Sequence, residues 1–534
     1  MLLVSLFVVL AEYCIILHAT DPVPKTNVNA DTTSNTLANQ KRGKSEENLN
    51  VQHDASGGDN RDEKLEDAKS KTNFENLRSL YGYDHAYFET SVNLGGAEKE
   101  DKKINEQIGN LYGTFKEKYV LPIAPDNLRY AFIIFRHGIR SPMHFPFQTI
   151  WAFQKMWGFG IGLLTKRGRR LMHHVGESLG TRYNKLVPHF DKNVVQFSSS
   201  KVGRARKSAK CVATGMFGPN DPVFTDKDSL TLAPCKNLPG VEVGNFDKCD
   251  LFADVDLKWL NQCNMYTRLR KQSQQREKQE VSPQRKVFYN LLNECIHNSY
   301  QIPGFARKLY HSAKAFDTFQ SWILNKKEAL KECVAHAMPV MQKAVQLHLW
   351  YEIHGKTNMV EYYIGLLVNT ILTEMSNGLQ KDPTQSRQNL EDPENGHTES
   401  KFGERRLKMH FHGSHDVTVS PLFWVLSQDE TYYALTGDTL IVEMTSDYTV
   451  QVFLFSPLTL GKGEKFRQIS LKPLCGKEDC KYEEFEKALT KFSYDEPTWN
   501  SKCKDDAKLT SDDRPLPHDI NDEDLQIMQR PVTN

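Results

Sequence analysis

The 534-residue sequence lacks an excess of charge of either sign, because 68 lysines and arginines are balanced by 67 aspartates and glutamates. This balance excludes a protein that holds nucleic acid or an anionic membrane by bulk positive charge. Apolar residues are also scarce, at 39% of the chain against about 45–50% in ordinary globular proteins, and the mean hydropathy is −0.56. Long apolar runs are missing after the N-terminal segment, which excludes a membrane protein with several spans.

The one long apolar stretch lies at the N-terminus, from Leu2 to Ala19, and Glu12 interrupts it. Its length suits a signal peptide, and Ala19 supplies a small residue at a cleavage point. The alternative is a retained signal anchor, in which Glu12 would lie in hydrocarbon at a high cost in free energy. We therefore expect residues 1–19 to be a signal peptide. The remaining chain is then expected to be secreted or lumenal, in the secretory pathway or a lysosome-like compartment, with no stable membrane span.

The polar residues are concentrated in segments that are too poor in apolar side chains to form a core. One domain is expected over residues 118–503. Before it we expect a largely disordered extension over 20–117, with a helix near 104–117. Within the domain we expect a polar loop over 377–406. After it we expect a disordered acidic tail over 504–534.

Cysteine usage points to an oxidising compartment. Ten cysteines are present, of which Cys14 lies in the predicted signal peptide. The remaining odd number predicts a few disulfides and one free thiol. Cys475 and Cys480 are close enough in sequence to close a small loop. Paired CxxC spacings are absent, which argues against a structural zinc site.

The first chemical motif follows an apolar run. Residues 130–135 read Tyr-Ala-Phe-Ile-Ile-Phe, a pattern typical of a buried parallel strand, and residues 136–142 read Arg-His-Gly-Ile-Arg-Ser-Pro. Two guanidiniums and an imidazole therefore stand where open α/β sheets bind ligands, at the carboxyl end of a strand. Guanidinium forks match phosphate oxygens, and a neutral imidazole nitrogen can accept a phosphoryl group. The alternative, a solvated basic loop, is disfavoured by the full string after such a strand.

This string resembles the opening RHGxRxP motif of the histidine acid phosphatases, the second branch of the histidine phosphatase superfamily. Residues 158–168 resemble the family's Gly-Phe-Gly and Leu-Thr segments, with Thr165 as the expected N-cap of the next helix. Arg204 stands four residues before a Ser-Ala pair, where the family carries a third phosphate-binding arginine, and Arg206 is the alternative. His415-Asp416 resembles the family's late His-Asp motif at the end of a strand.

Two other histidine pairs could be mistaken for metal ligands. His410 and His412 alternate along the strand that precedes the late motif, and we interpret them as sheet residues because no third ligand is in view. His173 and His174 are adjacent on a predicted helix and should diverge from one another.

The resemblance implies one α/β domain. Its doubly wound, mostly parallel sheet is flanked by helices, and a mainly helical cap is inserted over about 222–335. Residues 440–444 and 450–455 look like paired strands in the closing part of the domain.

The resemblance also implies an acid phosphatase that hydrolyses phosphomonoesters without a metal or other cofactor. Phosphate would bind to Arg136, Arg140, Arg204 and His415. His137 would form a phosphohistidine, and Asp416 would protonate the departing alcohol. The substrate is expected to be a small-molecule or glycan phosphomonoester and not nucleic acid, and a homodimer is compatible with this prediction.

Two alternatives stay open. One is a phosphatase of the same fold that is specialised for inositol phosphates such as phytate, or for a phospho-sugar on a glycan. The other is an inactive phosphate-binding or interaction protein.

Overall fold

The structure is a computed structural model that describes residues 94–112, 119–143, 157, 160–191, 193–200, 202–218, 243–245, 263–301, 306–379, 407–459, 464–478, 480–504 and 512–529. The predicted signal peptide, most of the polar extension and nearly all of the 377–406 loop lie outside these residues.

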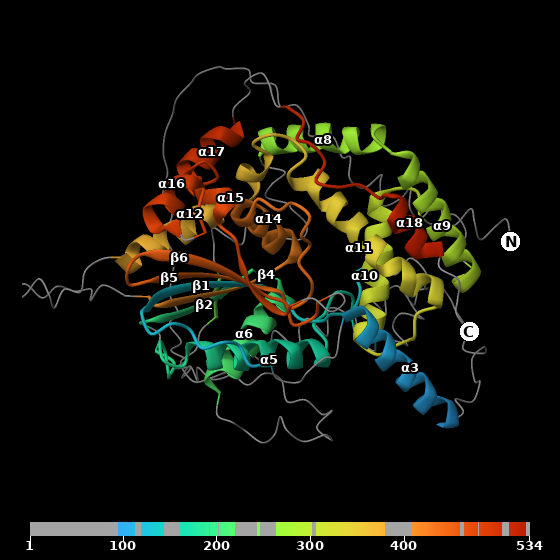
Figure 1. Cartoon of the computed structure of the whole chain (residues 1–534), viewed down its shortest axis with the longest axis horizontal. Coiled ribbons are helices and arrows are strands. Elements are labelled where there is room, and N and C mark those ends of the chain that lie inside the picture. Colours follow the sequence, from blue (N-terminus) through green and yellow to red (C-terminus); the bar gives the residue numbers. More distant parts are fainter. Residues whose placement is uncertain are drawn as a thin grey trace, which may run out of the picture. The chain divides into compact units, whose positions relative to one another are not determined.

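The labels of the elements follow Figure 1. The strands are β1 Leu128–Arg136, β2 Val195–Ser199, β3 Val243–Asn245, β4 Met409–Ser414, β5 Thr439–Thr445, β6 Thr449–Phe455, β7 Phe466–Ile469 and β8 Cys480–Lys481. The helices are α3 Leu94–Tyr112, α5 Lys166–Tyr183, α6 Gly203–Phe217, α8 Asn264–Gln279, α9 Pro283–Tyr300, α10 Leu309–Leu324, α11 Glu332–Ile353, α12 Met359–Leu379, α14 Asp416–Ser427, α15 Lys472–Cys475, α16 Tyr482–Thr490, α17 Glu496–Lys504 and α18 Asp522–Gln529.

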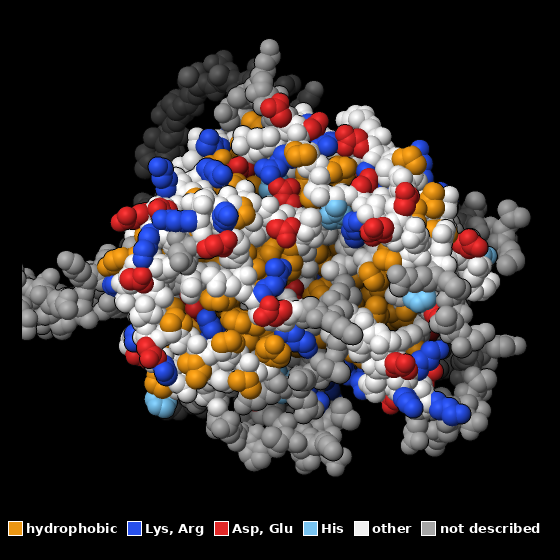
Figure 2. All heavy atoms as spheres, viewed as in Figure 1, with side chains coloured by type: hydrophobic (Ala, Val, Ile, Leu, Met, Phe, Trp, Pro, Cys, Tyr) orange, Lys and Arg blue, Asp and Glu red, His pale blue; other side chains and the backbone are white. Residues whose placement is uncertain are grey.

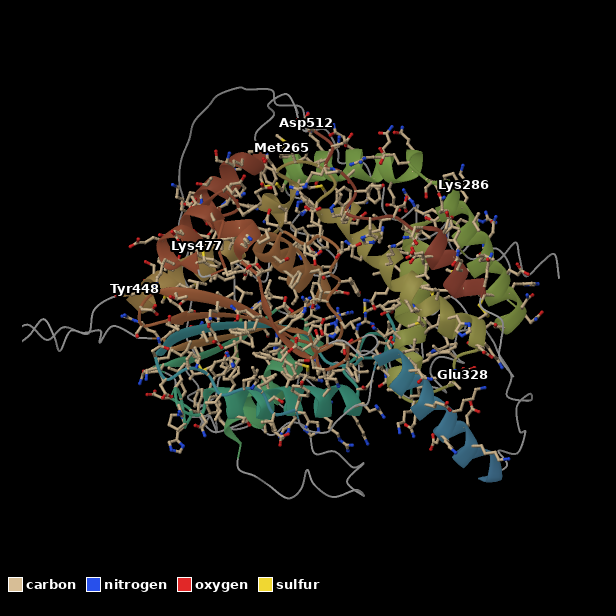
Figure 3. The ribbon with its side chains drawn as sticks, in the orientation of Figure 1. Met265, Lys286, Glu328, Tyr448, Lys477 and Asp512 are labelled. Atoms are coloured by element: carbon tan, nitrogen blue, oxygen red, sulfur yellow. A yellow bond between two sulfur atoms is a disulfide. The ribbon has the colours of Figure 1, made fainter. Side chains whose placement is uncertain are left out.

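The sheet is mixed rather than mostly parallel. Its strand order is β3-β2-β4-β1-β5-β6-β7, with β8 paired to β6. Strands β1 to β4 are joined in parallel pairs, whereas β5 to β8 are joined in antiparallel pairs. The predicted pairing of 440–444 with 450–455 is confirmed as the β5–β6 hairpin. Three residues connect these two strands, too few for the helical crossover that a parallel pair needs. Figure 3 labels Tyr448 in this turn.

Helices cover both faces of the sheet. In the view of Figure 1, α5 and α6 lie below the strands, and α12 and α14 lie above them. Helix α6 packs against β2 and β4, and α14 packs against β1 and β5. Strand β1 is buried over almost its whole length, as a sheet covered on both faces requires. The α/β class that the sequence predicted is therefore confirmed.

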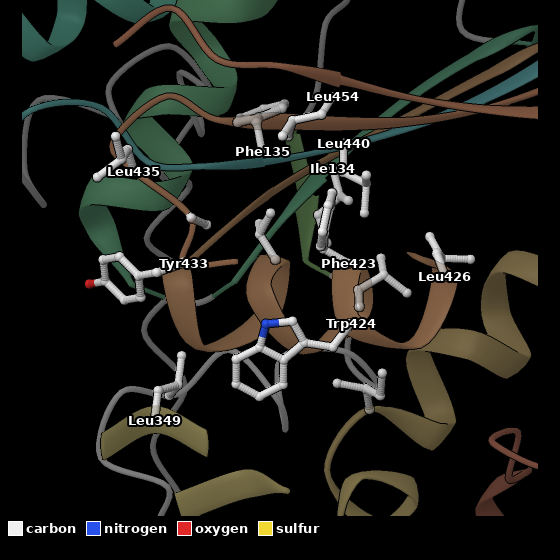
Figure 4. Packing of buried hydrophobic residues seen from close by; sticks show 14 of the residues in the cluster. Ile134, Phe135, Leu349, Phe423, Trp424, Leu426, Tyr433, Leu435, Leu440 and Leu454 are labelled. Carbon is white, nitrogen blue, oxygen red and sulfur yellow. The ribbon is translucent and has the colours of Figure 1, made fainter. Parts of the chain in front are cut away.

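Helix α14 joins the sheet to the helical cap. Figure 4 shows Phe423 on its sheet side, near Ile134 and Leu440, and Trp424 on the other side, toward Leu349 of α11. Trp424 is also fixed by polar contact, because its indole Nε1 donates to the backbone oxygen of Tyr432 at 2.7 Å. The helix that carries Asp416 at its N-terminus is thus held between two packed layers.

The helical cap differs from the predicted range in two described places. The predicted limits of 222–335 include β3, which pairs with β2 and belongs to the sheet. Helix α11 runs well beyond the predicted limit, and α12 follows it and packs against β1. A three-residue strand is too short to show a strand pattern in the sequence, which explains why β3 was assigned to the cap.

Three disulfides join pairs of described cysteines, and Cys211 of α6 is disulfide-bonded as well. Cys295–Cys333 joins α9 to α11 within the cap, and Cys263–Cys503 joins the start of α8 to α17. The predicted small loop is closed by Cys475–Cys480. Such bonds are typical of proteins that fold in the oxidising secretory pathway.

The C-terminal segment corrects the prediction of a disordered tail over 504–534. Residues 512–529 are folded against the cap and end in α18, where Leu525 is 9% exposed. Their carboxylates form ion pairs with cap residues: Asp513 with Lys356 at 2.6 Å, Asp519 with Arg285 at 2.8 Å and Asp524 with Lys343 at 2.7 Å. The acidic run shows no signal of order in the sequence because its partner cations lie far away in the chain, on α9, on α11 and in the connection between α11 and α12. Figure 3 labels Asp512 at the start of this segment.

Helix α3 also differs in extent from the helix that was predicted near 104–117. It begins at Leu94 and ends at Tyr112, and residues 113–117 lie outside the described part. Ile104 and Ile108 are buried, as their helical spacing predicts. The side chain of Gln107 exchanges two hydrogen bonds of 2.8 Å with the backbone of Leu330.

Charges of both signs are present on the face of the molecule that Figure 2 shows. Figure 2 shows positive and negative side chains interspersed over the visible face. Within the described residues, no helix combines the length and the apolar character that crossing a membrane requires.

Candidate active site

Contacts from three elements fix the backbone that follows β1. The amide of Arg136 donates to Asp438 O at 2.9 Å, and the amide of His137 donates to Ser414 O at 2.9 Å. The amide of Gly138 donates to the hydroxyl of Ser208 in α6 at 3.0 Å. A Cβ at Gly138 would lie 2.5 Å from Gly168 O, so only glycine allows α5 to approach this closely.

Helix α5 begins as the sequence predicts. Thr165 is its N-cap, and its hydroxyl oxygen accepts from the amide of Gly168 at 3.1 Å. The same hydroxyl donates to Ile139 O at 3.0 Å, so the cap also anchors the loop that carries the basic motif.

His137 is buried, and the backbone oxygen of the next residue orients its ring. Its Nδ1 lies 2.9 Å from Gly138 O, which assigns the hydrogen of the neutral ring to Nδ1 and leaves a lone pair on Nε2. Burial lowers the pKa of His137 well below its usual value, and Arg204 and His415 lower it further. The ring is therefore neutral and able to act as a nucleophile at Nε2.

Three arginines crowd around this imidazole. Arg136 and Arg204 are 3% and 9% exposed, and the side chain of Arg140 is 11% exposed. The Nε atoms of all three are buried and have no hydrogen-bond partner among the described residues. Burial and the neighbouring Arg140 lower the pKa of Arg204 to about 9. An anion with several oxygens would satisfy these donors and relieve the repulsion between the guanidiniums.

His415 faces His137 across the site. The ring centroids are 5.3 Å apart in an edge-on arrangement, and Nε2 of His415 lies 2.8 Å from the hydroxyl of Ser200. Burial lowers the pKa of His415 well below its usual value, and Arg204 adds to the effect. If Ser200 donates to Nε2, the hydrogen of the neutral ring lies on Nδ1, which has no partner among the described residues.

Asp416 is the first residue of α14 and is held by three groups. Its Oδ2 lies 2.9 Å from Nη2 of Arg136 and accepts from the hydroxyl of Tyr433 at 2.6 Å. Its Oδ1 accepts from the amide of Val417 at 3.0 Å. Burial would raise the pKa of this carboxyl, but Arg136 and Tyr433 outweigh burial and hold it at about 2.

The structure brings all six predicted site residues together: Arg136, His137, Arg140, Arg204, His415 and Asp416. Between the two candidates for the third arginine it favours Arg204, which is buried and acts on His137, over the half-buried Arg206.

Sequence reasoning missed Ser200, Tyr433 and Asp317. Ser200 follows directly after β2, so the rule that ligands bind at the carboxyl ends of strands could have found it. Asp317 of α10 forms an ion pair of 2.7 Å with Arg140, and no local pattern signals it.

The other histidine pairs take part in local contacts. His410 and His412 lie on either side of the Ser198 hydroxyl, at 3.0 and 2.9 Å. His173 and His174 both approach Glu177, at 3.9 and 2.7 Å, with their ring planes 86° apart. Among the described residues, this second group and Glu277, His348 and Glu352 are sets whose donor atoms come within 4.8 Å of one another. Neither set includes a residue of the phosphate site.

Solved structures of phytases are among those that align with this chain. The Citrobacter braakii phytase aligns over 71% of this chain and 99% of its own, with a TM-score of 0.43 and 16% identity. The Hafnia alvei phytase in complex with myo-inositol hexakis sulphate aligns over 70% and 98%, with a TM-score of 0.47 and 13% identity.

Curated relatives are acid phosphatases at low identity. The lysosomal acid phosphatase of Xenopus laevis is 26% identical over 159 residues, which cover 29% of this chain and 34% of that protein. The prostatic acid phosphatase of Bos taurus is 24% identical over 314 residues, which cover 55% and 68%. The chain thus spans about a third of the length of the Xenopus relative. The family model of the histidine phosphatase superfamily (branch 2) matches residues 114–441. With the motif residues assembled as described, the chain belongs to the second branch of the histidine phosphatase superfamily.

Proposed function

We propose that the protein is an acid phosphatase that hydrolyses phosphomonoesters through a phosphohistidine on His137. The observation that carries this proposal is the geometry of the cluster. Three buried guanidiniums, each with an Nε that has no partner among the described residues, surround a neutral imidazole. The donors suit the equatorial oxygens of a phosphoryl group in transfer, and their fixed charge stabilises the negative charge that spreads over those oxygens.

In the first half-reaction, Nε2 of His137 attacks the phosphorus of the bound ester. Arg136, Arg140 and Arg204 hold the phosphoryl oxygens, and Nδ1–H of His415 donates to one of them. The P–N bond forms as the P–O bond to the alcohol breaks. The departing oxygen takes the proton of Asp416, because an alkoxide is a poor leaving group.

In the second half-reaction, the roles reverse. The Asp416 carboxylate takes a proton from water, and the water oxygen attacks phosphorus. The P–N bond breaks and its electron pair returns to Nε2 of His137. Inorganic phosphate then leaves, and His137 is again neutral.

The protonation of Asp416 needs an explanation, because Arg136 and Tyr433 hold its pKa at about 2 against the effect of burial. A bound phosphoryl group brings negative charge beside Arg136 and weakens the field that stabilises the carboxylate. The pKa of Asp416 then rises, and a singly charged ester can also supply the proton. Both effects favour activity at acidic pH.

The alcohol part of the substrate would lie toward Tyr433. A cavity of about 300 Å³ adjoins this residue, between α11, the segment before β5 and the C-terminal segment. Its other lining residues are mostly polar: Pro339, Gln342, Lys343, Gln346, Thr431 and His518. Such a lining suits an alcohol with hydroxyl groups, and a panel of aryl phosphate, phospho-sugars and phytate would rank the substrates. The disulfides and the named lysosomal and prostatic relatives support a site of action in the secretory pathway or a lysosome-like lumen.

His137→Ala tests the proposal directly. We expect hydrolysis of an aryl phosphate at acidic pH to fall by at least about a thousandfold, because the covalent route is lost. The matched control is His189→Ala, which removes an exposed imidazole and should leave the rate unchanged. Circular dichroism would show that both variants fold. Normal turnover by the His137 variant would refute the proposal.

A further inference from the structure

Helix α10 brings a second carboxylate to the phosphate site. Oδ1 of Asp317 lies 2.7 Å from Nη2 of Arg140, and Oδ2 accepts from the amide of Met143 at 2.7 Å. The side chain of Asp317 is 15% exposed. Asn325, the C-cap of the same helix, donates to the backbone oxygen of Arg140 at 3.1 Å. The cap therefore contacts this arginine twice, through an ion pair to its side chain and a hydrogen bond to its backbone oxygen.

These contacts fix how Arg140 presents its guanidinium. Nη2 is engaged by Asp317, and Nη1 donates to Ser141 O at 3.0 Å. Nε has no partner among the described residues. Asp317 thus binds Nη2 of Arg140 and leaves Nε for a ligand. The ion pair holds the guanidinium in one orientation, which an arginine without this partner would adopt only part of the time.

Asp317 also changes the charge of the site. Arg136, Arg140 and Arg204 carry three positive charges, whereas Asp416 and Asp317 carry two negative charges. With both histidines neutral the sum is +1, from three minus two. With Asp416 ionised as in the unliganded site, a doubly charged phosphoryl group would leave the site at −1 and a singly charged one would leave it neutral. A doubly charged group would therefore reach a neutral complex only if Asp416 took up a proton. Excess charge in a buried site is costly, because little water screens it.

We propose that Asp317 is a positioning and specificity-determining residue that orients Arg140 and makes the site favour the singly charged form of a phosphate group. This inference rests on the proposed function, because it concerns the same site. It means that a residue of the cap helps to determine which ionisation state of the substrate binds.

The charged and titratable groups that face Asp317 come from every side of the site. Arg140 lies on the motif loop and Arg136 at the end of β1, whereas Arg204 is on α6. Tyr433 precedes β5, and Asp317 acts on this hydroxyl as well as on Arg136 and Arg204. On its own helix, Lys314 is directed instead to the ring of Tyr310, at 4.4 Å. Asp416 is the other carboxylate, and it faces Arg136.

The test measures the affinity for inorganic phosphate in the His137→Ala background, where no turnover occurs. Binding is followed by calorimetry at about pH 5 and about pH 8, on either side of the second ionisation of phosphate. In the His137→Ala protein we expect tighter binding at the lower pH. Adding Asp317→Asn should lower the ratio of the dissociation constants at high and low pH by about tenfold, because repulsion acts more strongly on the doubly charged ion. Loss of orientation weakens binding at both pH values, so the ratio is insensitive to it.

Two control variants separate charge from shape. Asp317→Glu keeps the charge and should keep the ratio, even if its longer side chain weakens binding. Asp126→Asn removes the same charge from an exposed pair with Lys185 and should change neither constant. An unchanged ratio in Asp317→Asn would overturn the role of Asp317 in selecting the charge state.

A second readout uses the active enzyme with the same Asp317→Asn substitution. We expect the fall of kcat/KM on the alkaline side to move up by about one pH unit, as the doubly charged ester becomes acceptable. If the variant instead slows poor leaving groups far more than good ones, Asp317 is a proton donor and the inference is wrong. Failure of the His137→Ala protein to bind phosphate at either pH would refute the proposed function itself. Phosphate binding with an unchanged ratio would refute only the role of Asp317.

Discussion

At the scale of single residues, Asp416 shows most directly how surroundings decide chemistry. Burial alone would raise the pKa of this carboxyl, but Arg136 at 2.9 Å and the Tyr433 hydroxyl at 2.6 Å stabilise the carboxylate and lower the pKa more. The unliganded residue is therefore ionised at mildly acidic pH. Its ability to donate a proton depends on how far a bound phosphoryl group weakens these two contacts.

Asp416→Asn tests the role of proton donor. We expect the rate with alkyl phosphates to fall much more than the rate with aryl phosphates, because a good leaving group departs without a proton. The measurement is a plot of kcat/KM against the pKa of the leaving alcohol. Equal slowing across the series would show that Asp416 has another role.

Tyr433→Phe should shift the pH dependence. The Tyr433 hydroxyl donates to the ionised form of Asp416, so its removal favours the protonated form and raises the pKa of the carboxyl above about 2. The donor then keeps its proton to higher pH, and the alkaline limb of the kcat profile, which reports groups in the enzyme–substrate complex, should move up. The shift should stay below about one pH unit, because Arg136 remains. A downward shift would contradict this assignment.

The six clustered residues could be predicted because they lie in short motifs that resemble those of the family and follow one another in the family's order. Arg136, His137 and Arg140 stand at and after the end of β1, whereas Arg204 stands in α6 and His415-Asp416 at the end of β4. Tyr433 and Asp317 could not be predicted in this way, because folding alone brings them to the site. Asp317 and the amide of Met143 that it binds are 174 residues apart in the chain. Contacts of this kind depend on how the cap is placed, and no spacing rule encodes that placement.

At the scale of elements, the C-terminal segment 512–529 acts as a strap over the cap. Arg285 of α9 is fully buried, and its Nε lies 2.8 Å from Oδ1 of Asp519 in this strap. The backbone oxygen of Arg514 accepts from Nη1 of Arg276 in α8 at 2.6 Å. The strap is therefore fastened to two cap helices as well as through Lys343 on α11.

Asp519→Ala should destabilise the protein by about 2–4 kcal/mol, because it leaves the buried charge of Arg285 without its carboxylate. Urea unfolding, followed by tryptophan fluorescence, would measure the change. Asp126→Ala is the matched control, since its pair with Lys185 is largely exposed and should leave the transition in place. Equal transitions for the two variants would mean that the strap adds no stability.

An element could be predicted when the sequence pattern that indicates it lies within a few neighbouring residues. The apolar run of β1 and the β5–β6 hairpin were predictable, because pattern and turn lie within a few residues. β3 was not, since three residues show no periodicity. The strap was also missed, because a run of acidic residues looks solvated until its cations, which are distributed over α9 and α11, are known.

At the scale of the whole molecule, two disulfides of very different span can be compared. Cys263–Cys503 closes a loop with a sequence separation of 240, and Cys475–Cys480 closes one with a separation of 5. In the chain-entropy account, a bond that closes a longer loop restricts the unfolded chain more.

Replacing Cys263 and Cys503 together by alanine should lower the free energy of unfolding by about 3–5 kcal/mol. The same replacement of Cys475 and Cys480 should cost clearly less. Thermal unfolding of both double variants under oxidising conditions provides the comparison. A larger loss from the short loop would show that chain entropy does not set the order.

The Cys263–Cys503 bond also has a consequence for the order of biosynthesis. A ribosome makes Cys263 long before Cys503, so the ring that they close stays open until nearly the whole chain has entered an oxidising compartment. Until Cys503 arrives, Cys263 is a thiol without its native partner. Cys295 and Cys333 are made before Cys503, so Cys263 can form a disulfide with either of them first. Correct maturation therefore depends on delaying or repairing the wrong pairing, a task for thiol exchange rather than for the folding of any one element.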